Sequence, residues 1–285
     1  MDPQDLKPGD VVKRHRMSTR VWHWVNALCL CIMLMSGLMI FNAHPRLYWG
    51  EYGANDDPAW LVIDDAGDTG FVELAGIRFE TTGILGVWTS PDGEVKRRAF
   101  PHWITIPSGY DLQSGRRWHF TFAWVLSFAL LIFMLRSLWN GHIRRDLHLS
   151  KEQRSPHHVW HEIKDHARLR FPTGAAATRY NILQKMSYIA VIFLLLPTMI
   201  FTGLTMSPAM NAAWPWLLDI FGGRQSARSV HFICAFGLVA FFVAHILMVI
   251  LAGPINEMRS MITGRYRLPG KPAKEMPHPK AGKMP

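Results

Sequence analysis

Two histidines in the last apolar stretch of the chain have the spacing of two cofactor ligands on one helix. The stretch runs from Ser229 to Ala252 and contains His231 and His245. In an α-helix, their separation of 14 residues closes to within roughly 40° of whole turns, so both imidazoles leave the same face. A rise of about 1.5 Å per residue places them about 21 Å apart along the axis. One face with an imidazole at each of two depths suggests two stacked cofactors.

Two further histidines, His23 and His119, lie in or at the edge of other apolar stretches. An ionisable group inside a bilayer is costly and is usually functional. Taken singly, His23 can equally be an interfacial histidine without a cofactor. The three cysteines are interpreted as small apolar packing residues. No C-x-x-C-H motif occurs, so covalent c-type haem is not indicated.

Four stretches without Asp, Glu, Lys or Arg must position these histidines. Each has 18 to 24 residues, which is long enough to cross a bilayer as a helix. The alternative is four buried helices of a soluble protein, but such helices are usually shorter and amphipathic. The sequence therefore predicts an all-α membrane protein, a four-transmembrane-helix bundle. The expected spans are 21–42, 118–135, 186–206 and 229–252.

The charged residues outside these spans predict how the chain is oriented. The segments 1–20, 136–185 and 253–285 together carry a net charge of +13, and the loops 43–117 and 207–228 carry −3. The positive-inside rule then places both termini and the middle loop in the cytoplasm. The overall charge of +10 is explained by this topology and by anionic lipid, and it does not call for a nucleic acid. We expect a cytoplasmic arm, a bundle domain over 21–252 and a basic cytoplasmic tail.

The loop 43–117 is too long to be a simple connector. Two alternating runs, Gly76–Trp88 and Glu94–Ile106, are separated by the turn signal Ser90-Pro91-Asp92-Gly93. These features predict a small β-rich insertion outside the membrane. Its acidic rim could dock a soluble partner, and a lid over a buried cofactor is an equally good interpretation. In the middle loop, Ser155-Pro156 predicts the start of a surface helix.

The predicted topology sorts the four histidines into two pairs by depth. His23 and His245 lie toward the cytoplasm, and His119 and His231 lie toward the outside. Two opposed imidazoles with no carboxylate or thiolate suit the axial positions of a planar haem. Zinc would normally require four ligands, and a proton relay would usually include Asp or Glu. Two six-coordinate haems leave no open iron site, so the predicted role is electron transfer across the membrane.

Arginines beside these histidines are candidates for binding haem propionates, because guanidinium groups pair well with carboxylates. The candidates are Arg20 on the cytoplasmic side, with Arg117 and Arg228 on the outer side. The alternative is that they are ordinary flanking charges.

At this point the chain resembles a known family, the bacterial cytochrome b561/nickel–iron hydrogenase cytochrome b group, and within it the thiosulfate reductase cytochrome b subunits. The resemblance covers nearly the whole chain. It is carried by RVWHW (Arg20–Trp24), FNAHPRLYWGEYG (Phe41–Gly53), GRRWHF (Gly115–Phe120), LTMSPAM (Leu204–Met210) and GGRQSARSVHF (Gly222–Phe232), with His245 downstream.

The resemblance implies a bacterial inner-membrane subunit with four helices and two haems b, and the same histidine pairs. Similar subunits exchange electrons between the quinone pool and a periplasmic molybdopterin or hydrogenase subunit. By analogy the quinone site lies near the cytoplasmic haem, with Asn26, Gln184, Lys185 and Tyr188 as candidates. The long external loop departs from the shortest family members. Two alternatives remain open: a self-contained superoxide:quinone oxidoreductase, which short relatives resemble, and a haem-free transporter.

Overall fold

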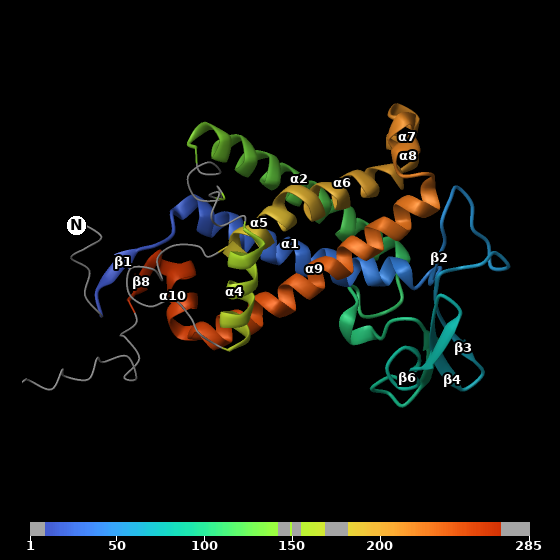
Figure 1. The fold of residues 1–285 in the computed structure, drawn as a ribbon. Coiled ribbons are helices and arrows are strands. Elements are labelled where there is room, and N and C mark those ends of the chain that lie inside the picture. Colours follow the sequence, from blue (N-terminus) through green and yellow to red (C-terminus); the bar gives the residue numbers. More distant parts are fainter. Residues whose placement is uncertain (1–8, 142–148, 150–154, 169–181, 269–285) are drawn as a thin grey trace, which may run out of the picture. The chain divides into compact units, whose positions relative to one another are not determined.

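The computed structural model describes residues 9–141, 149, 155–168 and 182–268, and four apolar helical segments dominate it (Figure 1). All four are long and apolar enough to cross a membrane. The four predicted spans are therefore confirmed as helices, and each extends beyond its charge-free core because flanking charged residues are also helical. The segments are α1 (Met17–Phe41), α2 (Leu112–Trp139), α5 (Ile182–Ala190) continued by η4 (Val191–Leu195) and α6 (Leu196–Thr205), and α9 (Arg224–Ala252).

The third span contains an irregular turn at a proline. Its middle part, η4 (Val191–Leu195), is a π-helical turn, and Pro197 follows it in the first turn of α6. Proline has no backbone N–H, so the regular hydrogen-bond ladder is interrupted there. A widened turn absorbs that interruption without ending the helix.

A buried apolar cluster receives side chains from all four spans. Apolar packing of this kind holds the helices together, because the hydrophobic effect adds little between helices inside lipid. Its members are Cys29 and Met33 of α1, Leu126 and Leu130 of α2, Val191 and Leu196 of the third span, and Leu238 of α9.

The segment between α1 and α2 contains two small antiparallel sheets. The four-stranded sheet has the order β2-β3-β4-β5, and β6 pairs with β7 in a hairpin. The strands are β2 (Arg46–Leu47), β3 (Leu61–Ala66), β4 (Thr69–Leu74), β5 (Ile77–Glu80), β6 (Gly86–Thr89) and β7 (Val95–Arg98).

The turn predicted at Ser90–Gly93 is confirmed, since it joins β6 to β7. Gly93 has φ +83°, and the Ser90 N–H donates to the Glu94 carbonyl over 2.9 Å. The strand-like run predicted over 94–106 is correct only as far as Arg98. Residues 102–104 form instead a 3₁₀ turn, η2 (His102–Ile104). Prolines before and after this turn remove backbone donors that a strand would need.

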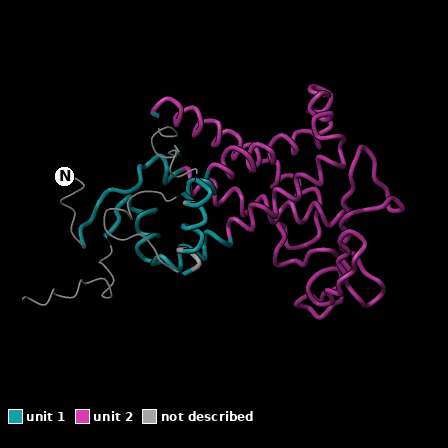
Figure 2. Tube along the Cα trace, viewed as in Figure 1, with its two compact units in different colours: residues 1–21, 141–188, 243–285 teal, residues 22–140, 189–242 magenta. Residues whose placement is uncertain are grey.

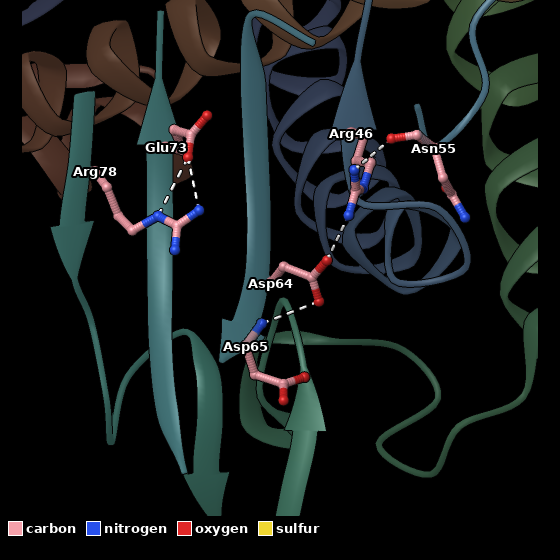
Figure 3. A network of polar contacts seen from close by, with 6 residues as sticks. All are labelled: Arg46, Asn55, Asp64, Asp65, Glu73 and Arg78. Atoms are coloured by element: carbon pink, nitrogen blue, oxygen red, sulfur yellow. Dashed lines mark hydrogen bonds and ion pairs between the residues drawn. The ribbon is translucent and has the colours of Figure 1, made fainter. Parts of the chain in front are cut away.

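Ion pairs link side chains on neighbouring strands of the four-stranded sheet (Figure 3). Arg46 bonds Asp64 over 2.8 Å, and Arg78 lies directly opposite its partner Glu73 at 2.9 Å. Exposed pairs of this kind contribute about 0–1 kcal/mol each, so they add little to stability. The stabilising contacts lie in a buried cluster that the insertion shares with the end of α1: Leu38, Phe41, Leu47, Leu61, Ile63, Ala99 and Phe100.

The chain divides into two compact units, which Figure 2 shows in different colours. Unit 2, magenta in Figure 2, comprises residues 22–140 and 189–242, and contains the apolar cluster of the spans and the two sheets of the insertion. Unit 1, teal, comprises residues 1–21, 141–188 and 243–285.

In unit 1 the two ends of the described chain pair with each other. The strand β1 (Val11–Lys13) lies antiparallel to β8 (Arg265–Arg267), which follows α10 (Pro254–Thr263). Arg14 binds Glu257 at 3.0 Å. This pairing was not predicted from the sequence. The middle-loop helix is confirmed as α4 (Pro156–Ala167), and the tail from residue 269 onward lies outside the described residues.

Candidate functional site

Two of the four candidate histidines lie close together in unit 2. His119 of α2 and His231 of α9 have ring centroids 6.2 Å apart, with the ring planes tilted by 59°. Two metal–imidazole bonds of about 2.0 Å, with roughly 1.1 Å from each nitrogen to its ring centre, would place the centroids about 6 Å apart. The observed separation fits one metal atom between the two rings.

The His119 ring is held in place by α1. Its Nδ1–H donates to the Met33 carbonyl at 3.0 Å and faces the Ser36 hydroxyl oxygen at 3.2 Å. Ser36 donates its own proton to the Ile32 carbonyl at 2.7 Å, so its oxygen is available as an acceptor. This network assigns the proton of neutral His119 to Nδ1.

The His231 ring is held in a similar way by α6. Its Nδ1 lies 2.9 Å from the Thr202 hydroxyl oxygen. Thr202 donates to the Thr198 carbonyl at 2.6 Å, so its oxygen accepts the Nδ1–H of His231. In both rings the second nitrogen, Nε2, carries the free lone pair that a metal needs, and the bonded Nδ1 fixes the ring's orientation.

A glycine follows each of these hydroxyl residues and makes room for the imidazole. A Cβ added to Gly37 would lie 3.3 Å from His119 Cε1, and one added to Gly203 would lie 3.5 Å from His231 Cε1. The same dipeptide, a hydroxyl residue followed by glycine, therefore supports each ring. The hydroxyl residues were not predicted as partners of the histidines, although the repeated dipeptide is visible in the sequence.

The donor set is two neutral imidazoles. Among the residues that the structure describes, no group of three or more His, Cys, Asp or Glu side chains is placed to hold a metal ion. Two imidazoles at this separation fit the two axial positions of a porphyrin iron, and the glycines keep the rings' surroundings free of bulk.

The other two candidate histidines belong to different compact units. His23, in the same unit as His119, packs edge-on against Trp24 with centroids 5.0 Å apart. His245 lies half-buried on α9, in the part of the helix that belongs to unit 1. The pairing of His23 with His245 stays a prediction.

The three candidate arginines lie in different surroundings. Arg117 is exposed on α2. Arg20 donates from Nε to the Met261 carbonyl at 3.4 Å and from its terminal nitrogen to the Ile262 carbonyl. Arg228 donates to the carbonyls of Arg46, at 3.0 Å, and of His44. Arg20 and Arg228 are therefore already engaged with backbone carbonyls.

Arg228 anchors the loop after α1 to the first turns of α9. Next to it, Ser229 donates to the Tyr48 carbonyl over 2.5 Å and accepts from the Trp60 indole at 2.9 Å. Burial, then the cations Arg228 and Arg46, lower the pKa of His44 below its usual value. Burial raises the pKa of Tyr48. Both rings are therefore neutral near pH 7 and add no charge to this side of the unit.

Asn26, one turn along α1 from His23, has a buried side-chain oxygen with no hydrogen-bond partner among the described residues. A buried acceptor of this kind costs free energy unless something binds it. The remaining polar candidates for a quinone site, Gln184, Lys185 and Tyr188, lie on α5, and all three belong to the other unit.

Comparisons with known proteins give one family model and one relative that match more than half of the chain. The family model for prokaryotic cytochrome b561 matches residues 14–264, which include all four histidines. The chain is also similar to a putative protein-methionine-sulfoxide reductase subunit, YedZ1, of Azospira oryzae. The two are 28% identical over 155 residues, a match that covers 53% of this chain and 74% of the relative.

Proposed function

Because the chain belongs to the prokaryotic cytochrome b561 family, and is thus an integral membrane electron-transfer protein of the haem b type, we propose that it is the di-haem subunit that exchanges electrons between quinone and a periplasmic catalytic subunit. The observation that carries the proposal is the His119–His231 pair. Its ring separation of 6.2 Å and its two bonded Nδ1 atoms are what bis-imidazole ligation requires.

In this proposal His119 and His231 hold one haem b, and His23 and His245 hold the other. When bound, haem b supplies a one-electron couple whose potential the protein tunes through its axial ligands and their hydrogen bonds. Ser36, Thr202 and the Met33 carbonyl orient the two imidazoles of the first pair and raise their basicity. Gly37 and Gly203 leave the space that each ring needs.

The proposed quinone site lies beside the His23–His245 pair. The buried, unpartnered oxygen of Asn26 supports it, because it is ready to accept a hydrogen bond from a quinol hydroxyl. Arg20, Arg117 and Arg228 are proposed to stabilise haem propionates electrostatically. For Arg20 and Arg228 this role is shared with the backbone carbonyls that they already bind.

The proposed partner is a periplasmic oxidoreductase subunit, with molybdopterin as its expected cofactor. The Azospira relative is named as a reductase subunit, which supports a membrane protein that serves a separate catalytic chain. The strand-containing segment 43–117 carries seven basic and eleven acidic residues. We place it outside a bacterial inner membrane, with both termini in the cytoplasm, where it is a surface for that partner.

Haem quantitation on histidine variants tests the proposal. Pyridine haemochrome analysis should give two haems b per chain for the purified wild-type protein. His231→Ala and His245→Ala should each retain one, because each removes a ligand from a different pair. His161→Ala, in the exposed middle helix α4, is the control and should retain both. Two haems surviving in either ligand variant would contradict the assignment of the ligands. Co-purification of a second subunit would distinguish the proposed electron-transfer subunit from a self-contained oxidoreductase.

A further inference from the structure

A cavity with a strongly basic lining lies within unit 1, where β1 and β8 meet the first turn of α1. Its volume is about 620 Å³, within the range of about 300–1,000 Å³ that is typical of small-molecule sites. Its lining includes four basic side chains and no Asp or Glu. The basic residues are Lys13, His15, Arg20 and Arg265, and Met17 and Thr263 complete the wall between them.

Two of these cations face each other across the strand pair. Lys13 and Arg265 are directly opposite in the β1–β8 register, and both are exposed. Like charges at directly opposed positions destabilise a sheet. Neither side chain forms an ion pair with any residue that the structure describes.

The neighbouring cation Arg14 differs from these two. Both of its bonds to the Glu257 carboxylate are 3.0 Å, and its guanidinium lies 4.4 Å from the centre of the Tyr266 ring. The charge of Arg14 is therefore neutralised within the chain, whereas Lys13 and Arg265 are open to an external anion.

The wall of the cavity adds fixed positive potential. The first turn of α1 begins at Met17, and the N–H groups of a helix's first turn lack partners within the helix. Arg20 is held at the wall by its bonds to the Met261 and Ile262 carbonyls, so its charge stays near the cavity. Backbone donors at a helix start together with several guanidinium or ammonium groups recognise phosphate well.

We propose that this cavity binds a phosphate-bearing anion, with Lys13 and Arg265 as its principal ligands. Since Met17 begins a helix that is long and apolar enough to cross a membrane, the cavity lies at headgroup depth beside that span. One source of the anion is therefore the phosphodiester of an anionic phospholipid, and the other is free phosphate. Bridging by the anion would convert the repulsion between the two strands into attraction.

The test uses the full-length protein in an uncharged detergent. Three probes are titrated at matched ionic strength: dioctanoyl phosphatidylglycerol, dioctanoyl phosphatidylcholine and sodium phosphate. Native mass spectrometry counts bound lipid, and thermal unfolding gives an apparent Kd. We expect the double variant Lys13→Gln/Arg265→Gln to bind phosphatidylglycerol about 25-fold more weakly than wild type, since each lost cation costs about fivefold.

The matched control is Arg16→Gln/Arg267→Gln, which removes the same charge from the same two segments but outside the cavity lining. It should bind phosphatidylglycerol as wild type does. Without any probe, the Lys13/Arg265 variant should unfold at a higher temperature than the control, because its opposed charges are gone. Lys13→Arg keeps the charge and should keep the binding.

The three probes distinguish the sources of the anion. Binding of phosphatidylglycerol well below the concentrations at which phosphate binds assigns the lipid headgroup, and equal saturation by both assigns free phosphate. Equal binding of phosphatidylglycerol to the Lys13/Arg265 variant and to its control would overturn the proposal. So would binding of phosphatidylcholine as tight as that of phosphatidylglycerol.

Discussion

At the scale of single residues, the two imidazoles are held in the same way. His119 has two acceptors for its Nδ1–H, the Met33 carbonyl at 3.0 Å and the Ser36 hydroxyl at 3.2 Å. His231 has the Thr202 hydroxyl at 2.9 Å and the backbone carbonyl of Met199. Residue types and spacing predicted the histidines, because ionisable groups are rare in apolar spans. The acceptors escaped prediction because a serine or threonine in a span usually bonds only its own helix.

We predict that Thr202→Val and Ser36→Ala each weaken retention of the one haem that His119 and His231 are proposed to hold, and leave the haem of the other pair unchanged. Valine keeps the shape of threonine but removes the oxygen that accepts the Nδ1–H of His231. Loss of such a hydrogen bond to a metal-ligating histidine typically costs about 10–100-fold in metal affinity or activity. Haem retention during dilution and the midpoint potential of each haem are the measurements. With His231 less basic, its haem should become easier to reduce.

Ser36→Ala is the matched variant for the other ligand of the same pair. Unchanged haem retention in both variants would show that the hydroxyl groups do not act as these distances indicate.

At the scale of elements, the spans were predictable and the strands only partly so. Long charge-free stretches identify spanning helices directly. The strand β3 was missed because Leu61, Val62 and Ile63 are all buried, so no alternation of apolar and polar residues marks it. Sequence periodicity detects a strand only when one of its faces is exposed. The turn at Ser90–Gly93 was predictable because its residue types favour that local geometry.

The close packing of α1 against the His119 ring leads to a prediction about Gly37. A Cβ at this position would lie 3.3 Å from the ring, which is tighter than most real contacts. Gly37→Leu should therefore displace His119 and reduce the haem content to about one per chain, as the loss of one axial ligand implies.

Gly203→Ala is the control, because its Cβ would meet His231 at 3.5 Å, an ordinary contact distance. It should keep both haems and gain up to about 1 kcal/mol of helix propensity. Absorption spectra of both purified variants decide the matter, and a Gly37→Leu protein with two haems would refute the packing argument.

At the scale of the whole molecule, charge counts predict an orientation that the fold does not by itself determine. Segments on one side of the four spans sum to +13, and those on the other side to −3. Basic loops are retained in the cytoplasm during insertion. The prediction that His23 and His245 lie at one depth, toward the cytoplasm, depends on this topology together with the four helices.

Reporter fusions test the orientation. Alkaline phosphatase inserted at the exposed turn Gly83–Ile84 should be active, because we expect this turn to face the periplasm. The same enzyme fused after Pro285 should be inactive, and green fluorescent protein at that end should fluoresce. The reverse pattern would invert the assignment of both histidine levels.

The strand pair β1–β8 has a consequence for how the protein is made. Val11–Lys13 emerges from the ribosome first, but Arg265–Arg267 follows only after the fourth span has been synthesised. Until then β1 is a lone strand with unpaired backbone groups, open to proteases. The β1–β8 pair therefore forms only in chains whose synthesis has passed residue 267, and a truncated product keeps an unpaired β1.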